Sequence, residues 1–166
     1  MRIILGILLL LGAALLQATL VGRIRLLQGP ADLVLVVLMT WMLQEGSRPD
    51  WKWGLPAGLM VGFASALPDW VLLIAYVAAA GLCQFFYQRI WQVHLLNLVT
   101  ATLLGTLGIH LITLTYLWLS TRPLNFGEAF NLVTLPSMLL NLIVVLPINA
   151  LVTEINKLVS PAAEMS

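Results

Sequence analysis

The chain of 166 residues has little charge: Asp, Glu, Lys and Arg together make up 9% of it, whereas hydrophobic residues make up 61%. A soluble domain of ordinary composition carries about 25% charged residues. Because so few charged side chains cannot cover a surface that faces water, the composition predicts an integral membrane protein. The net charge of +1 gives no reason to expect a nucleic-acid partner.

Cysteine and catalytic motifs are also scarce. The single cysteine, Cys83, excludes an internal disulfide and a cysteine-based metal cluster. The sequence has no glycine-rich phosphate loop, no HExxH motif, and no Ser-His-Asp set or carboxylate pair at one depth. No acidic residue lies near the centre of a predicted span, where ion-coupled pumps usually keep one. We therefore expect a non-enzymatic protein without a catalytic site, a metal, a cofactor or an ion-pumping activity.

The apolar residues form six candidate membrane spans in a single domain of residues 1–166. The spans cover residues 3–21, 31–43, 53–67, 70–87, 95–119 and 132–152. They predict an all-α, polytopic membrane protein that folds as a compact bundle of about six transmembrane helices. The first span is too long for the apolar part of a signal peptide, so we expect it to be retained. The second and third are shorter than the roughly 20 residues that cross a bilayer, so a re-entrant pair is the alternative for these two.

Basic residues predict the orientation. With the N-terminus in the cytoplasm, five of them lie on the cytoplasmic side: Arg2, Arg48, Lys52, Arg89 and Lys157. The other three lie outside: Arg23, Arg25 and Arg122. Because basic residues favour the cytoplasmic side, we expect both termini to be cytoplasmic.

Small residues recur at a spacing of four and predict close helix packing. One stripe lies on the third span and consists of Gly54, Gly58, Gly62 and Ala66. A pair, Ala14 and Ala18, lies on the first span. These residues pack either against other helices of this chain or against the helix of a partner protein, and the sequence leaves both alternatives open.

Several polar side chains lie within the apolar spans and should face the interior of the bundle, because lipid offers them no hydrogen bonds. We expect interhelical hydrogen bonds from Gln17, Asn97, His110 and Asn141. Binding of a proton or metal is the alternative for His110. Asn141 has no acidic residue near it in the sequence and is predicted to act as an interhelical latch. Asp32, Asp50 and Asp69 each stand just before an apolar segment, where aspartate caps helices.

Four stretches resemble the family of the rod shape-determining protein MreD. The first is Leu15-Leu16-Gln17-Ala18-Thr19-Leu20 with Arg23-Ile24-Arg25-Leu26, and the second is Gly29-Pro30-Ala31-Asp32-Leu33-Val34-Leu35. The third is the glycine-rich stretch Gly54-Leu55-Pro56-Ala57-Gly58-Leu59-Met60-Val61-Gly62-Phe63. The fourth is the set Pro136, Asn141 and Pro147 in the last span. Their order along the chain is more specific than any one of them. The chain departs from the family late in the third span, where Ala64-Ser65-Ala66-Leu67-Pro68 stands in place of the usual acidic residue.

The resemblance implies a scaffold of the cell-elongation machinery in the bacterial inner membrane that helps regulate peptidoglycan synthesis. Such proteins associate with MreC, and through it with MreB, RodA and a class B penicillin-binding protein. The family is similar in fold to the substrate-binding S-components of energy-coupling-factor vitamin transporters, and an S-component is the alternative function. A third alternative, an accessory subunit of a respiratory or photosynthetic complex, depends only on His110 as a haem or pigment ligand.

Overall fold

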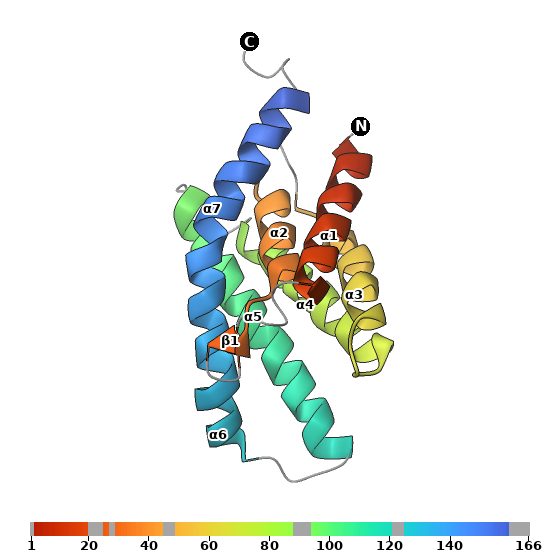
Figure 1. Ribbon diagram of the computed structural model, residues 1–166, viewed down its shortest axis with the longest axis vertical. Coiled ribbons are helices and arrows are strands. Elements are labelled where there is room, and N and C mark those ends of the chain that lie inside the picture. Colours follow the sequence, from red (N-terminus) through yellow and green to blue (C-terminus); the bar gives the residue numbers. More distant parts are fainter. Residues whose placement is uncertain are drawn as a thin grey trace.

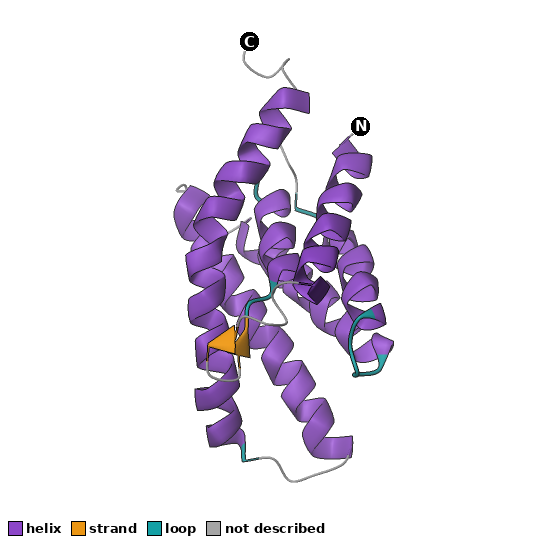
Figure 2. Cartoon of the chain, viewed as in Figure 1, coloured by secondary structure: helices purple, strands orange, loops and turns teal. Residues whose placement is uncertain are grey.

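The computed structural model describes residues 2–19, 25–26, 29–44, 49–87, 94–120 and 125–159. These residues are almost entirely helical (Figure 2). The helices are α1 (Arg2–Thr19), α2 (Leu33–Met42), α3 (Gly54–Phe63), α4 (Asp69–Tyr87), α5 (His94–Ser120), α6 (Phe126–Ala129) and α7 (Leu135–Val159). A 3-10 turn, Trp51–Trp53, precedes α3, and a π-helical turn, Phe130–Thr134, joins α6 to α7. Strands β1 (Arg25–Leu26) and β2 (Gly29–Pro30) pair antiparallel, with Arg25 opposite Pro30.

A helix lies at each of the six predicted segments, so the all-α prediction is confirmed for the described residues. Within the part of the chain that the structure describes, three helical stretches are long and apolar enough to cross a membrane: Arg2–Thr19, His94–Ser120 and Gly127–Leu158. Helices α2 and α3 have 10 residues each. At 1.5 Å per residue, each is about 15 Å long, which is half the thickness of a hydrocarbon core of about 30 Å. The last helical stretch extends beyond both ends of the predicted span 132–152.

Helix α2 lies at the centre of the molecule and the other long helices surround it. It contacts α1, α3, α4, α5 and α7, and every residue from Val34 to Met42 is buried. Helices α5 and α7 run side by side along the long axis, and the start of α1 lies at the same end of the molecule as the end of α7 (Figure 1). The central position explains why α2 is apolar on all sides, since a helix that is covered all round has no face for water.

The glycine stripe of α3 packs against α4 of the same chain. A Cβ atom on Gly54 would lie 2.6 Å from the Tyr76 carbonyl oxygen, and one on Gly58 would lie 2.8 Å from the Leu73 Cα. Gly62 is buried as well. These three glycines therefore serve packing within the chain and leave no room for a partner's helix.

The three predicted alanines, Ala66, Ala14 and Ala18, do not belong to the seam between α3 and α4. Helix α3 ends at Phe63, so Ala66 lies beyond the helix and is exposed rather than part of the stripe. The stripe was expected to continue to Ala66 because its spacing is regular, but the chain turns immediately before Pro68 and the start of α4. On α1, Ala14 is half-buried and Ala18 is exposed.

Candidate functional site

Polar side chains from five parts of the chain meet at the start of α2. We call this group the Asp32 cluster; it consists of Gln17 on α1, Asp32 immediately before α2, Tyr76 on α4, Thr106 on α5 and Asn141 on α7. Tyr76, Thr106 and Asn141 are at most 1% exposed, whereas Gln17 and Asp32 are half-buried. The cluster therefore lies inside a bundle whose other buried residues are mostly apolar.

The cluster supplies acceptors for the backbone N–H groups at the start of α2. The first N–H groups of a helix have no partner within the helix, and leaving them unpaired in an apolar interior is costly. The Asn141 Oδ1 accepts from the N–H of Asp32 at 2.7 Å, and the Gln17 Oε1 accepts from the N–H of Val34 at 3.0 Å. The Asp32 Oδ1 accepts from the N–H of Leu35 at 3.0 Å. Helix α2 can therefore begin deep in the bundle.

Asp32 caps α2 as its position in the sequence suggests, but its surroundings differ from the prediction. Its Oδ2 accepts a hydrogen bond of 2.6 Å from the Tyr76 hydroxyl, which comes from α4. Its backbone N–H donates to Asn141, so an acidic residue that is 109 positions away in the sequence lies beside Asn141 in the fold. The physical reason is the shortness of α2, which starts between the other helices rather than at the edge of the bundle.

Asn141 joins α7 to two other helices. Its Nδ2 donates to the Thr106 Oγ1 at 2.9 Å, while its Oδ1 holds the start of α2. It occupies the position of the latch that the sequence predicts. The Thr106 hydroxyl in turn donates to the Thr102 carbonyl oxygen at 2.7 Å, so one polar chain runs from α2 through α7 into α5.

His110 lies one turn further along α5 on the same face as Thr102 and Thr106. Its Nδ1 is 3.1 Å from the Thr134 Oγ1 in the π-helical turn before α7. This is the contact with another helix that the sequence predicts for a neutral imidazole. Among the described residues, no group of three or more His, Cys, Asp or Glu side chains lies close enough together to hold a metal ion.

Asn97 is half-buried near the start of α5, far along that helix from Thr106. Tyr76 and Thr106 are members of the cluster that the sequence does not predict. A signal for Thr106 exists, because Thr102, Thr106 and His110 recur at a spacing of four and so share one helix face. Tyr76 stands alone in an alanine-rich helix and offers no such pattern.

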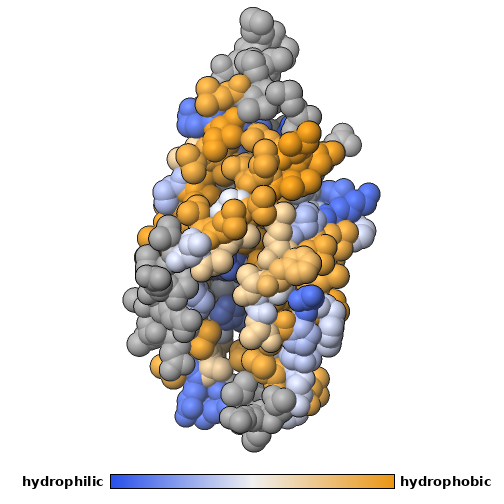
Figure 3. Space-filling model, turned by 45° about the vertical axis from the view of Figure 1, so that its right-hand side comes forward, coloured by the Kyte–Doolittle hydropathy of each residue, from blue (hydrophilic) through white to orange (hydrophobic). Residues whose placement is uncertain are grey.

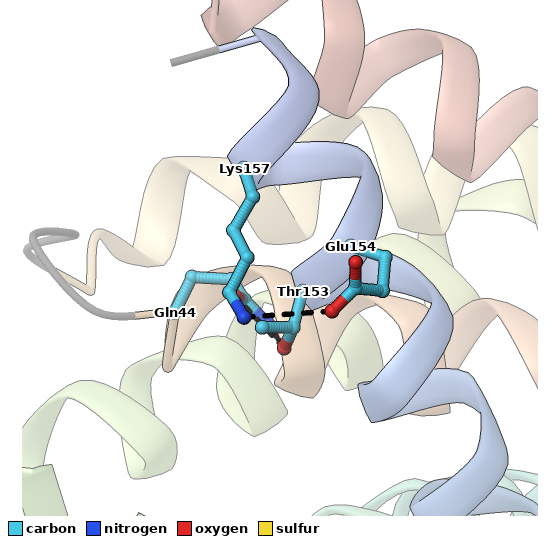
Figure 4. A network of polar contacts seen from close by, with 4 residues as sticks. All are labelled: Gln44, Thr153, Glu154 and Lys157. Carbon is cyan, nitrogen blue, oxygen red and sulfur yellow. Dashed lines mark hydrogen bonds and ion pairs between the residues drawn. The ribbon is translucent and has the colours of Figure 1, made fainter. Parts of the chain in front are cut away.

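The other end of α2 is also tied to α7. Gln44, which follows α2 and is 3% exposed, donates from its Nε2 to the Thr153 Oγ1 at 3.2 Å. Figure 4 shows these two residues beside the exposed pair Lys157 and Glu154 of α7, whose charged atoms are 3.4 Å apart. Both ends of the central helix are thus fastened to the last helix of the chain.

The geometry of the Asp32 cluster suits holding helices together better than it suits a reaction. Each oxygen of the Asp32 carboxylate already accepts a hydrogen bond, one from the backbone and one from Tyr76. Both polar atoms of the Asn141 side chain are likewise engaged. A general base or a nucleophile needs an atom that can reach a substrate, and these atoms already form hydrogen bonds within the bundle.

Comparisons of the chain with models of protein families, with curated proteins and with solved structures found no match.

Proposed function

We propose that this chain is a non-enzymatic scaffold of the cell-elongation machinery, similar to MreD, in the bacterial cytoplasmic membrane. It binds MreC and, through MreC, connects to MreB, RodA and a class B penicillin-binding protein. In this proposal the helices form a polytopic bundle with both ends of the chain in the cytoplasm.

One observation carries the proposal. Three of the four stretches that resemble the MreD family each contribute a side chain to the Asp32 cluster: Gln17, Asp32 and Asn141. A chance likeness between leucine-rich helices gives no reason for their few polar positions to meet in space. The remaining stretch is the glycine-rich α3, and it provides the close packing with α4. The residues behind the resemblance therefore serve architecture, as a scaffold requires.

The surface supports placement in a membrane. Large apolar side chains that are more than half exposed occur on α1, α4, α5 and α7, and they include Ile3, Leu8, Trp70, Leu119 and Ile143. Hydrophobic residues cover much of the face drawn in Figure 3. The start of α1 and the end of α7 lie at the same end of the molecule (Figure 1), which supports placing both on one side of the membrane.

The outer face of α1 is the best surface for the helix of MreC. Of the three long apolar stretches, α1 is the least covered: 17% of its most hydrophobic window is buried, against 39% for α5. Ala18 is exposed on α1, whereas Ala14 is half-buried against the core and the glycines of α3 are used within the chain. Small residues on an open helix face allow a second helix to approach closely in lipid.

Purification from the native membrane in mild detergent tests the proposal. We expect MreC to be retained by the chain and to be lost from an Ala18→Leu variant, because Ala18 is exposed whereas Ala14 packs against the core. The matched control is Gly81→Leu on α4, where an added Cβ would have no atom within 4 Å. Failure to retain MreC under conditions that keep the chain folded would contradict the scaffold.

The alternative S-component gains support from a different observation. The face in Figure 3 is hollowed at about mid-height, and hydrophilic side chains lie at the bottom of the hollow. Ligand sites in membrane proteins often combine an apolar wall with a few polar groups of this kind. A tightly bound vitamin or copurifying ATPase subunits in the same experiment would favour this alternative over the scaffold.

A further inference from the structure

The backbone that leads into α2 lies directly against the start of α7. Strand β2 contacts both α7 and the π-helical turn before it, and β1 lies beside α7 in Figure 1. A Cβ on Gly29 would overlap the Val133 carbonyl oxygen and would lie 2.8 Å from the Ser137 Oγ. Three residues after Gly29, the Asp32 N–H donates to Asn141, which lies one turn beyond Ser137 on α7. This stretch of backbone therefore contacts α7 at both of its ends.

Ser137 is exceptional among the polar residues along this face of α7. Its side chain is 0% exposed, yet within the described part of the chain its hydroxyl has no hydrogen-bond partner. Thr134, three residues earlier, contacts His110 on α5. Asn141, four residues later, donates to Thr106 on the same helix. Because an unpaired buried hydroxyl is costly, one that persists usually has an ordered water or an ion beside it.

The π-helical turn explains why Ser137 does not use the partner that other helical hydroxyls in this chain use. The hydroxyls of Thr40, Thr102 and Thr115 each donate to the carbonyl oxygen four residues earlier, at 2.8, 2.8 and 2.7 Å. For Ser137 that carbonyl belongs to Val133, which lies in the π-helical turn. The wider winding of such a turn shifts its carbonyl groups relative to the residues that follow it. The local hydrogen bond is therefore not made at this position.

A single water molecule can serve both oxygens. The Val133 carbonyl oxygen and the Ser137 Oγ lie within a hydrogen-bond length of one point, the position of a Cβ on Gly29, so they are no more than two hydrogen bonds apart. Buried waters typically make about three hydrogen bonds to groups that have no other partner. The backbone between the two contacts with α7 supplies further polar groups, and Ala31 within it is 7% exposed, so the place is closed to bulk solvent.

We propose that the Ser137 hydroxyl and the Val133 carbonyl, together with backbone groups of residues 29–32, bind one ordered water molecule. This water joins the entry of α2 to α7 one turn away from the hydrogen bond between Asp32 and Asn141. The entry of α2 is then fixed to α7 at two successive turns. The site depends on the fold alone and is the same whether or not the chain binds MreC, so it goes beyond the proposed function.

Nuclear magnetic resonance of the full chain in detergent micelles detects such a water directly. The probe is the cross-relaxation between water and the Cα protons of Gly29, which do not exchange with solvent and lie against the Ser137 Oγ. We expect a cross peak of the sign that a long-lived water gives, and we expect its loss in Ser137→Ala. The control is Thr113→Val, which removes a hydroxyl bonded within its own helix and should keep the cross peak. No cross peak in the natural chain, or an undiminished one in Ser137→Ala, would overturn the proposal.

The direction of the change in thermal unfolding temperature gives a second test. Ser137→Ala leaves the water with one partner fewer, so we expect this temperature to fall by about 3 °C. Alanine has a higher helix propensity than serine, so a fall cannot come from α7 itself. A rise would show that Ser137 is a bare hydroxyl whose removal relieves a cost, and it would overturn the proposal. A fall without any cross peak to water would show a direct bond to Val133 and would overturn it as well.

Discussion

The seam between α3 and α4 and the Asp32 cluster hold helices together by opposite means. At the seam, Gly54 and Gly58 allow two backbones to touch, and no polar side chain is needed. At the cluster, hydrogen bonds from α1, α4 and α7 converge on the start of α2, and Asn141 of α7 extends the network to Thr106 of α5. The seam requires that Gly54 and Gly58 have no side chains, whereas the cluster requires particular polar side-chain atoms. The two should therefore respond differently to substitution.

The largest effect should come from adding bulk to the seam. Gly58→Leu would place a Cβ 2.8 Å from the Leu73 Cα, a backbone atom that cannot move aside without separating α3 from α4. We expect a loss of about 3 kcal/mol in the free energy of unfolding, measured by titration with sodium dodecyl sulfate in mixed micelles. Gly81→Leu adds the same side chain where its Cβ would have no atom within 4 Å, and it should change the free energy of unfolding by less than about 0.5 kcal/mol. Equal losses in the two variants would show that the seam is not tight.

A smaller loss should follow when the cluster loses its link to α7. Asn141→Leu keeps a similar volume but leaves the Asp32 N–H without its acceptor and the Thr106 Oγ1 without the donor from Asn141, although the Thr106 hydroxyl still donates to Thr102. We expect a cost of about 2 kcal/mol, because unpaired buried polar groups lose their full solvation.

Thr106→Val supplies the second side of a double-mutant cycle with Asn141→Leu. The two side chains are in direct contact, so their effects should not add, and we expect a coupling energy of about 1 kcal/mol. Simple additivity would mean that this hydrogen bond contributes nothing measurable.

Tyr76→Phe should have a more modest effect, since it removes one hydrogen bond to the Asp32 carboxylate and keeps the ring. Hydrogen bonds to charged groups contribute more than neutral ones, so we expect a loss of about 1.5 kcal/mol in the same titration. The Leu35 N–H remains bound to Asp32 in this variant, and α2 should keep its helical content by circular dichroism. A loss of helix would show that Tyr76 does more than solvate the carboxylate.

The smallest effect should come from outside both regions. Lys157→Gln breaks an exposed ion pair between residues three apart on α7. Such pairs contribute little in water, so the free energy of unfolding should change by less than about 0.5 kcal/mol. A larger change would show that the end of α7 carries a contact beyond the pair with Glu154.

The sequence predicts the helices well because hydrophobic runs and breaks are local properties. It also identifies Gln17, His110 and Asn141 as residues that need partners inside the bundle. It does not reveal that α2 starts deep in the interior, because this depends on how α1 and α7 enclose it. For the same reason Asp32 reads as a helix cap at the edge of a membrane, although it lies between helices. The π-helical turn Phe130–Thr134 also leaves no clear pattern in the residues.

The hydrogen bond between Asp32 and Asn141 has a consequence for biosynthesis. Its two residues are 109 positions apart, so the ribosome must produce almost the whole chain before the bond can form. Until then the start of α2 lacks an acceptor that the finished protein supplies from its last long helix. Emergence of α7 is therefore the event that completes the interior, and a chain that stops before Asn141 would present membrane quality control with an unpaired backbone amide.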